Sequence, residues 1–300
     1  MYLRRGLLFA IATSVAMVLL LSIATADDTE ARTVINGDVV VDHDLTWYDD
    51  VFEVHGNVTV EGGTRLKILH ATVEIVGTHN GSHWFNATPG STLTLDNGTI
   101  KGSPYPVGIH LGGIGHMVDS MVTNVWTSNV TPAIDLSGAL TMLNTVVESA
   151  PDSTGILVTG SLEAESCEFR DLGLVSVRFS DPTIPGWSAI RNCSFEHPSA
   201  AAFDTFALSF QLSESITHTV DITVDGCSFD DFNYGVEAFL NSSMVNLTVT
   251  ASDFTGCPTG MTVTGNEANL VVRGCTFDGS GTVGLSVYVL EPMMRPLDTT

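Results

Sequence analysis

Two histidines of this sequence have the spacing of a metal-ligand pair. His79 and His83 are separated by three residues in the segment Gly-Thr-His-Asn-Gly-Ser-His-Trp. Imidazole nitrogens at this spacing bind zinc or copper together when both lie on one face of a helix. Glycine and asparagine surround the pair here, which predicts a loop instead. The pair is therefore a candidate copper or zinc site, and a solvated loop is the alternative.

Carboxylates could supply a different metal site. Asp225, Asp230 and Asp231 form a local acidic group. Calcium ions take about six to eight oxygen ligands in flexible geometry, so Ca²⁺ is a candidate cofactor for this group. The spacing matches no known calcium loop, and an ordinary acidic surface explains it equally.

Catalysis on a polysaccharide would need several titratable groups close together. The candidates are His110, Asp135 and Arg178, which take equivalent positions in a repeat described below. Glu237 is a further equivalent, but four copies separate it from Asp135, or roughly 19 Å of stacked strands. Since glycosidase carboxylates lie about 5–10 Å apart, Asp135 and Glu237 are excluded as such a pair. A solvated strand face is the simpler interpretation.

The cysteines favour packing over chemistry. There are five, an odd number, so at least one is not paired within the chain. Cys167, Cys193, Cys227 and Cys275 share one position of the repeat, which predicts a buried stack of small apolar thiols. Cys257 lies off this column and is expected near solvent. The sequence has no Cys-x-x-Cys motif, which disfavours a zinc site.

An internal repeat of about 25 residues positions all these groups. Eight copies of a six-residue segment align, from Leu95–Ile100 to Val272–Phe277, and a weaker copy ends at Val73. The fourth position is small and the sixth is large and apolar, which places both on one face of a strand. The third position favours residues that tolerate positive φ and predicts a left-handed corner. Its residues are Asn97, Asp119, Asn144, Ser166, Asn192, Gly226, Ala251 and Gly274.

Two more strands complete each repeat. One precedes the corner, and another follows a variable loop, with inward pairs such as Ile109/Leu111, Ile134/Leu136 and Val175/Val177. Three short strands per copy predict an all-β fold, a right-handed parallel β-helix. This single-stranded solenoid would have about nine to ten coils of about 25 residues. A pair of β-sandwiches is the alternative. The outward residues of the strand after the loop include His110, Asp135, Leu157, Ser176, Arg178, Ser209, Glu237, Thr262 and Ser286.

The Asn-Cys-Ser-Phe corner at Asn192 and the Gly-x-Thr-Leu-x-Leu strand at Gly90 resemble known repeats. They are similar to those of secreted right-handed parallel β-helix proteins of the pectate-lyase-like and NosD-like groups. The resemblance covers roughly residues 33–290 and implies this fold. It does not imply one activity, because these groups include lyases, hydrolases, adhesins and structural spacers. The Gly-His-Gly and Arg-Ile-Lys motifs of polygalacturonases are missing, and Arg178 lacks the carboxylate cluster of a pectate-lyase-like site.

The N-terminus indicates export. Arg4 and Arg5 precede an apolar run, and Ala24-Thr25-Ala26 provides a cleavage site. Residues 1–26 are therefore expected to be a signal peptide, or else an uncleaved N-terminal anchor. Acceptor motifs for N-linked glycans fit a secreted or cell-surface protein, although turn-rich composition also produces them. They lie at Asn57, Asn80, Asn86, Asn97, Asn129, Asn192, Asn241 and Asn246.

Charge excludes some partners. The sequence has 34 acidic residues against 11 Lys and Arg, for a net charge of −23. Such a surface repels nucleic acid and anionic lipid, so we expect no nucleic-acid partner and no membrane contact except through an uncleaved N-terminal segment.

The expected organisation is a solenoid with different ends. No corner can be placed in residues 33–70, so residues 27–70 are interpreted as cap strands. Residues 71–290 are interpreted as the repeats, and residues 291–300 as a tail leading to a missing cap or an end-to-end contact. The favoured function is an exported acidic surface protein with a structural, adhesive or glycan-contact role. Its partners would be polysaccharides or other cell-surface components. A polysaccharide lyase or hydrolase acting on one sheet face is the alternative.

Overall fold

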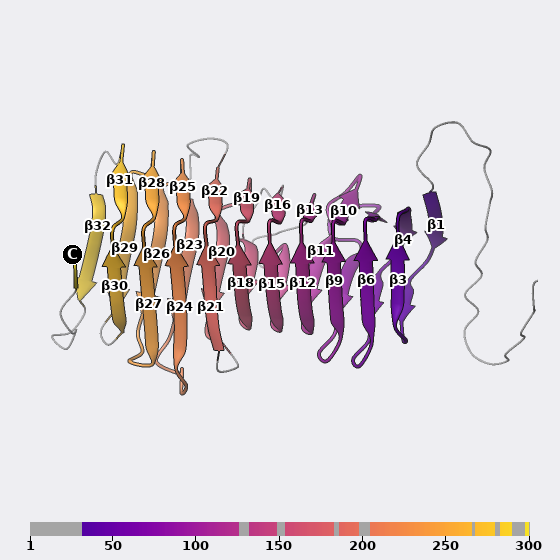
Figure 1. Cartoon of the computed structure of the whole chain (residues 1–300), viewed down its shortest axis with the longest axis horizontal. Coiled ribbons are helices and arrows are strands. Elements are labelled where there is room, and N and C mark those ends of the chain that lie inside the picture. The colour runs from indigo at the N-terminus through magenta and orange to yellow at the C-terminus, as the bar shows by residue number, and fades with distance from the viewer. Residues whose placement is uncertain are drawn as a thin grey trace, which may run out of the picture.

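The computed structural model describes residues 32–125, 132–148, 154–182, 186–197, 205–265, 268–279, 283–289 and 298–299. In these residues, 33 strands and no helix form three parallel sheets of eleven strands each. Each sheet takes every third strand of the chain, so successive coils stack along one long axis (Figure 1). The predicted all-β parallel β-helix is confirmed.

The three sheets are named A, B and C in the order in which the chain enters them. Sheet A contains β1 (Arg32–Asn36), β4 (Val51–His55), β7 (Thr72–Val76), β10 (Thr99–Ser103), β13 (Met121–Thr123), β16 (Val146–Glu148), β19 (Glu168–Arg170), β22 (Ser194–Glu196), β25 (Ser228–Asp230), β28 (Asp253–Thr255) and β31 (Thr276–Asp278). Sheet B contains β2 (Val39–Val41), β5 (Val58–Val60), β8 (Trp84–Ala87), β11 (Gly108–Leu111), β14 (Ile134–Leu136), β17 (Thr154–Val158), β20 (Val175–Ser180), β23 (Phe206–Leu212), β26 (Tyr234–Leu240), β29 (Thr259–Gly265) and β32 (Val283–Val289). Sheet C contains β3 (Leu45–Tyr48), β6 (Arg65–Leu69), β9 (Thr92–Asp96), β12 (Ile114–Val118), β15 (Ala139–Leu143), β18 (Ser161–Glu165), β21 (Gly186–Arg191), β24 (Val220–Asp225), β27 (Val245–Thr250), β30 (Asn269–Arg273) and β33 (Asp298–Thr299).

The corner between sheets C and A is left-handed, as predicted. All eight third-position residues, from Asn97 to Gly274, have φ between 48° and 63°. Asn, Asp and Gly tolerate this region, which explains their frequency there. The same conformation occurs at Asp49 and His70, with φ of 51° at each. His70 belongs to the weaker copy that ends at Val73, but the corner at Asp49 contradicts the expectation that none could be placed in residues 33–70.

The N-terminal strands already belong to the solenoid. Strands β1 to β6 pair in register with the coils that follow, so the segment expected as a cap consists of coils. Its first corner escaped notice because Asp50 stands where later copies have a small residue. The Asp50 carboxylate accepts hydrogen bonds from the Thr33 hydroxyl and the Val51 amide. These bonds satisfy its oxygens, so an acidic residue is accommodated at this end of the stack. At the other end, β33 pairs with β30 inside the segment expected as a tail.

Small residues line the inside of the corner because their side chains satisfy the backbone there. The Ser120 hydroxyl donates to the Val118 carbonyl and accepts from the Gly98 amide one coil earlier. The Cys167 thiol likewise donates to the Glu165 carbonyl. A hydroxyl and a thiol can therefore replace one another in this column, since each makes the same bond.

Phenylalanines fill the core beneath sheet A. Phe169, Phe195, Phe229, Phe254 and Phe277 stack in order, with ring centroids 4.7 to 5.1 Å apart. The first four are at most 1% exposed, as the large sixth position predicts. Small residues of sheet B lie opposite, since a Cβ at Gly260 would approach Phe277 Cδ1 to 2.2 Å.

One expected inward pair of sheet B is shifted by two residues. Register pairs Val177 with Leu208 and Phe179 with Phe210, so the inward pair of β20 is Val177/Phe179, not Val175/Val177. The Phe179 and Phe210 rings stack at 5.0 Å. Ser176, expected to face outward, is fully buried. Its position in the register is that of Gly260, in the row of small residues beside the phenylalanines.

Candidate functional site

One column of outward residues runs along sheet B and is called here the outer column. Parallel pairing places each member opposite the next, so neighbours are one coil, about 4.8 Å, apart. Its described members are Val40, Thr59, Asn86, His110, Asp135, Leu157, Arg178, Ser209, Glu237, Thr262 and Ser286, of which Ser209 is fully buried.

The structure brings together two of the three predicted catalytic candidates. His110 Nδ1 lies 3.2 Å from Asp135 Oδ2, with side chains 39% and 35% exposed. The Trp84 ring stacks on the imidazole with centroids 4.5 Å apart. The indole and the carboxylate thus hold the imidazole on an open surface.

Arg178 does not join this pair. It lies two coils from Asp135, roughly 10 Å along the column. Its Nε is buried without a hydrogen-bond partner among the described residues. Glu237 lies two coils further on and accepts a hydrogen bond of 3.4 Å from the Ser209 hydroxyl. The four-copy separation of Asp135 and Glu237 is confirmed, so these titratable groups are spread along the column.

Aromatic side chains border the outer column around β26. The Phe206 and Tyr234 rings stack at 4.9 Å on one side of Glu237. On the other side, Phe239 is 39% exposed and Tyr288, two coils further, is 60% exposed. Sequence reasoning missed this feature. The available signal was the strand Tyr-Gly-Val-Glu-Ala-Phe, in which ring, carboxylate and ring alternate with buried residues.

The two histidines of the predicted metal pair lie in the segment between β7 and β8. His79 Nδ1 is 3.1 Å from the Thr78 hydroxyl. His83 Nδ1 is buried and has no hydrogen-bond partner in the described part of the chain. No third ligand accompanies them, because the described residues contain no group of three or more His, Cys, Asp or Glu side chains that could hold a metal.

The predicted calcium ligands lie at different places around one coil. Asp225 ends β24 of sheet C, and its carboxylate accepts a hydrogen bond from the Thr250 hydroxyl at 2.6 Å. Asp230 ends β25 of sheet A, and Asp231 follows in a left-handed turn. Burial raises the pKa of Asp230 above its ordinary value, and neighbouring carboxylates, first Glu196, raise it further. A bound cation would relieve the repulsion between Asp230 and the neighbouring carboxylates.

Thermal melting distinguishes diffuse screening from a specific calcium site. We expect about 1 M NaCl to raise the midpoint of the purified chain, because the screening length falls to about 3 Å. About 1 mM CaCl₂ in low salt should add little, since no cluster among the described residues offers the six to eight oxygens that the ion takes. A large shift with calcium alone would instead establish a specific site.

The cysteine column is as expected, but Cys257 is not. Cys167, Cys193 and Cys227 are buried, and Cys275 is partly buried near the end of the stack. Cys257, expected near solvent, is fully buried, and its thiol donates to the Phe229 carbonyl at 3.5 Å. Burial raises its pKa to about 11. The expectation was wrong because Cys257 belongs to a second inward position, after sheet A, that the six-residue alignment does not cover.

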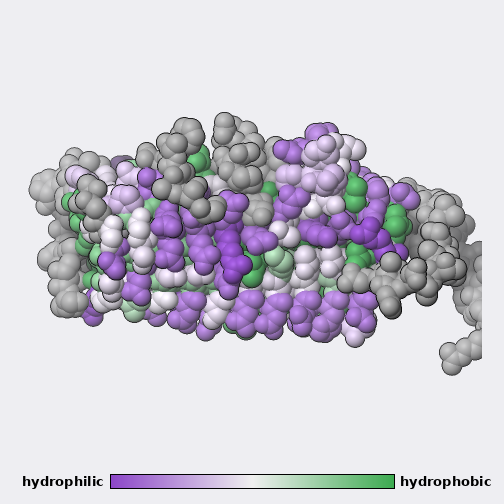
Figure 2. Space-filling model, turned by 90° about the horizontal axis from the view of Figure 1, so that it is seen from above, coloured by the Kyte–Doolittle hydropathy of each residue, from purple (hydrophilic) through white to green (hydrophobic). Residues whose placement is uncertain are grey.

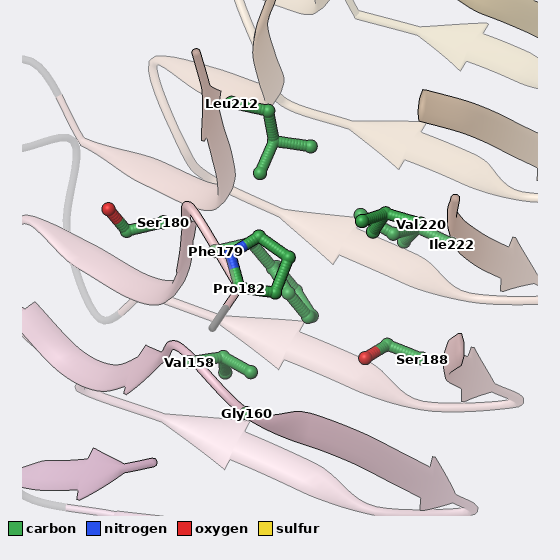
Figure 3. Close-up of a pocket in the computed structure, with 9 residues that line it drawn as sticks. All are labelled: Val158, Gly160, Phe179, Ser180, Pro182, Ser188, Leu212, Val220 and Ile222. Atoms are coloured by element: carbon green, nitrogen blue, oxygen red, sulfur yellow. The ribbon is translucent and has the colours of Figure 1, made fainter. Parts of the chain in front are cut away.

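A small pocket lies between sheets B and C where coils turn from β20 to β21. Figure 3 shows its walls, which are mostly buried apolar side chains such as Phe179, Leu212 and Ile222. Ser188 points toward it, but its hydroxyl already accepts the Leu162 amide at 3.1 Å. This pocket is a packing gap of the core and offers little to recognise a polar ligand.

The predicted glycan acceptors differ in exposure. Asn80 is exposed in a turn, whereas Asn57, Asn86, Asn241 and Asn246 are half-buried, and Asn129 lies outside the described residues. The Asn57 amide group donates to Asp38 and its oxygen accepts from the Trp84 amide. Asn246 donates to Asp221 at 2.6 Å. Asn97 and Asn192 are exposed as well, so Asn80, Asn97 and Asn192 are the accessible acceptors among the described residues.

Comparison of the chain with models of protein families finds no match, and comparison with curated proteins finds none either.

The expected signal peptide or anchor at residues 1–26 lies outside the described residues. Within the described part, no helix is long and apolar enough to cross a membrane. The face in Figure 2 carries many hydrophilic residues, including a row along its lower edge that follows the long axis.

Proposed function

We propose that the chain is an exported surface protein that contacts glycans through sheet B without cleaving them. The observation that carries the proposal is the arrangement around β26, where exposed and stacked aromatic rings flank a polar column. Aromatic rings pack against the C–H faces of a sugar, while carboxylates and hydroxyls bond its hydroxyl groups.

Three further observations support this function. Single exposed apolar residues are normal on a soluble surface, whereas several gathered along one face, as beside the outer column, indicate a binding site. The N-terminal signal pattern and the acceptor motifs favour export. The similarity of the repeats to pectate-lyase-like and NosD-like groups agrees with a secreted β-helix, although that similarity names no activity.

The spread of titratable groups favours binding over turnover. His110 and Asp135 are in contact, but Arg178 and Glu237 lie two and four coils from Asp135. General acid and base groups must reach the same bond within hydrogen-bond distance. A polysaccharide bound to this face would have at most two of these groups beside any one glycosidic bond.

The test is binding of the purified chain to a panel of polysaccharides, with product formation followed in parallel. We expect at least one to bind and Phe239→Ala to weaken it about tenfold, ~1.4 kcal/mol, by removing a stacking surface. Trp187→Ala is the matched control, because Trp187 is 52% exposed on sheet C. The Trp187→Ala variant should bind the polysaccharide as tightly as the unmodified chain.

Three results would contradict the proposal. A lack of binding to every polysaccharide in the panel would exclude glycans as the ligands. Weaker glycan binding by Trp187→Ala, with unchanged binding by Phe239→Ala, would place the contact on sheet C instead of sheet B. Release of new reducing ends or unsaturated products would establish the lyase or hydrolase alternative, and His110→Ala would then be the variant to examine.

A further inference from the structure

Three of the cysteines form a continuous thiol column at the corner between sheets C and A. Cys167, Cys193 and Cys227 lie on three successive coils, each one residue before a strand of sheet A. The residues that follow them, Glu168, Ser194 and Ser228, are direct register partners. The Ser194 amide donates to the Cys167 carbonyl and the Ser228 amide to the Cys193 carbonyl, so the spacing holds at the cysteines themselves.

The spacing of the backbones lies within the Cα range of a disulfide bond. Neighbouring strands are about 4.7–4.9 Å apart, and Cα atoms joined by a disulfide are usually about 4.4–6.8 Å apart. The Cys167 amide donates to the Cys193 sulfur at 3.4 Å, which places that sulfur against the preceding coil. Within the column, Cys193 is the only thiol with a cysteine neighbour on both sides.

The remaining two cysteines are placed differently. Ser252 occupies the column between Cys227 and Cys275, so those two thiols are two coils, roughly 10 Å, apart, beyond the reach of a disulfide. Cys257 lies at another corner, where its thiol donates to the Phe229 carbonyl. Both serve as internal controls for thiol chemistry in the same chain.

The thiol column lies beneath a polar groove, and Cys167, Cys193 and Cys227 are themselves only 1–2% exposed. A polar groove over the corner is lined by Cys167, Cys193 and Cys227, together with polar residues such as Glu168 and Asp253. Hydrogen bonds from the Cys193 thiol lower the pKa of Cys167 and of Cys227, against the opposing effect of burial, and the same contacts raise the pKa of Cys193.

We propose that Cys193 is the shared partner of one disulfide, formed with either Cys167 or Cys227 when the chain meets a low-molecular-weight disulfide such as oxidised glutathione. The thiolate of Cys167 or Cys227 attacks the oxidant, forming a mixed disulfide and releasing one small thiol. Cys193, once deprotonated, attacks the protein sulfur of that mixed disulfide and displaces the second small thiol. Two protein thiols are thereby oxidised and one small disulfide is reduced to two thiols.

The bond would join two coils covalently in the oxidising compartments where structural disulfides persist. That setting rests on the proposed export, but the reaction does not. The experiment therefore uses the purified, reduced chain, so its outcome is independent of localisation and of glycan binding.

The chain is incubated with oxidised glutathione, unfolded, and its free thiols are counted and mapped by mass spectrometry. The unmodified chain should fall from five thiols to three, with Cys193 in every protein disulfide. Cys193→Ser should form none, whereas Cys167→Ser and Cys227→Ser should each still form one. Cys257→Ser and Cys275→Ser should behave like the unmodified chain. Serine is tolerated in this column, as Ser120 and Ser252 show, and circular dichroism verifies that each variant is folded.

The proposal is overturned by retention of all five thiols after oxidation. It is equally overturned if Cys193→Ser still loses two thiols, or if the bond joins Cys257 or Cys275 to another residue. Addition of dithiothreitol should restore five thiols in the unmodified chain, which separates a disulfide from irreversible oxidation.

Discussion

Phe229→Ala is expected to lower the free energy of unfolding by about 3–5 kcal/mol. Phe229 is fully buried, and its ring stacks between Phe195 at 5.1 Å and Phe254 at 4.7 Å. Its removal leaves a cavity with a ring on each side, and the strands that carry these rings are fixed by their backbone pairing. Urea denaturation followed by circular dichroism measures the loss.

Phe239→Ala is the matched control for this variant. It deletes the same atoms from a side chain that is 39% exposed on the outer face of sheet B. We expect a loss of about 1 kcal/mol, because much of this surface already faces water. Equal losses at the two positions would mean that the phenylalanine column is not the core of the solenoid.

Gly160→Ala is expected to destabilise the chain by about 3 kcal/mol or more, at the upper end of what overpacking costs. A Cβ at Gly160 would lie 1.8 Å from the carbonyl oxygen of Gly138 on the preceding coil. That oxygen cannot move aside, because it accepts a hydrogen bond from the Ser161 amide, and this bond holds the two coils together. The clash can be relieved only by separating them. The same denaturation measurement applies.

Gly115→Ala separates this effect from a general intolerance of alanine. Its Cβ would approach only the flexible end of the Leu140 side chain closely, at 2.7 Å. A rotation of Leu140 relieves the contact, so the loss should stay below about 1 kcal/mol. If Gly115→Ala were as damaging as Gly160→Ala, close approach of the backbone would not be the cause.

The corners and the core were predictable because each depends on a local requirement. A positive φ restricts the residue type at positions such as Asn97 and Gly226, and this restriction is visible in one sequence. The phenylalanines recur because each must fill the same space above its predecessor. The corner at Asp49 was missed because Asp50 replaces the small residue there, so one of the two local signals is lost.

The details of sheet B were less predictable. The loops that lead into its strands vary in length, so the alignment of β20 shifted by two residues and placed Ser176 outside. Contact of His110 with Asp135 followed from equivalent positions in adjacent copies. The burial of Cys257 and the aromatic border at Phe239 depend on how side chains of different coils meet. Composition and spacing do not report that.

In the described residues, each strand pairs only with the strands one coil before and one coil after it. A solenoid of this kind has stability that is summed over neighbours rather than shared by a single centre. Its length is therefore a separable property. Gain or loss of one whole copy between two corners would alter the reach of the rod by a step of about 4.8 Å and leave the distant coils as they are. Selection could thus adjust the length of this protein without redesigning any of its surfaces.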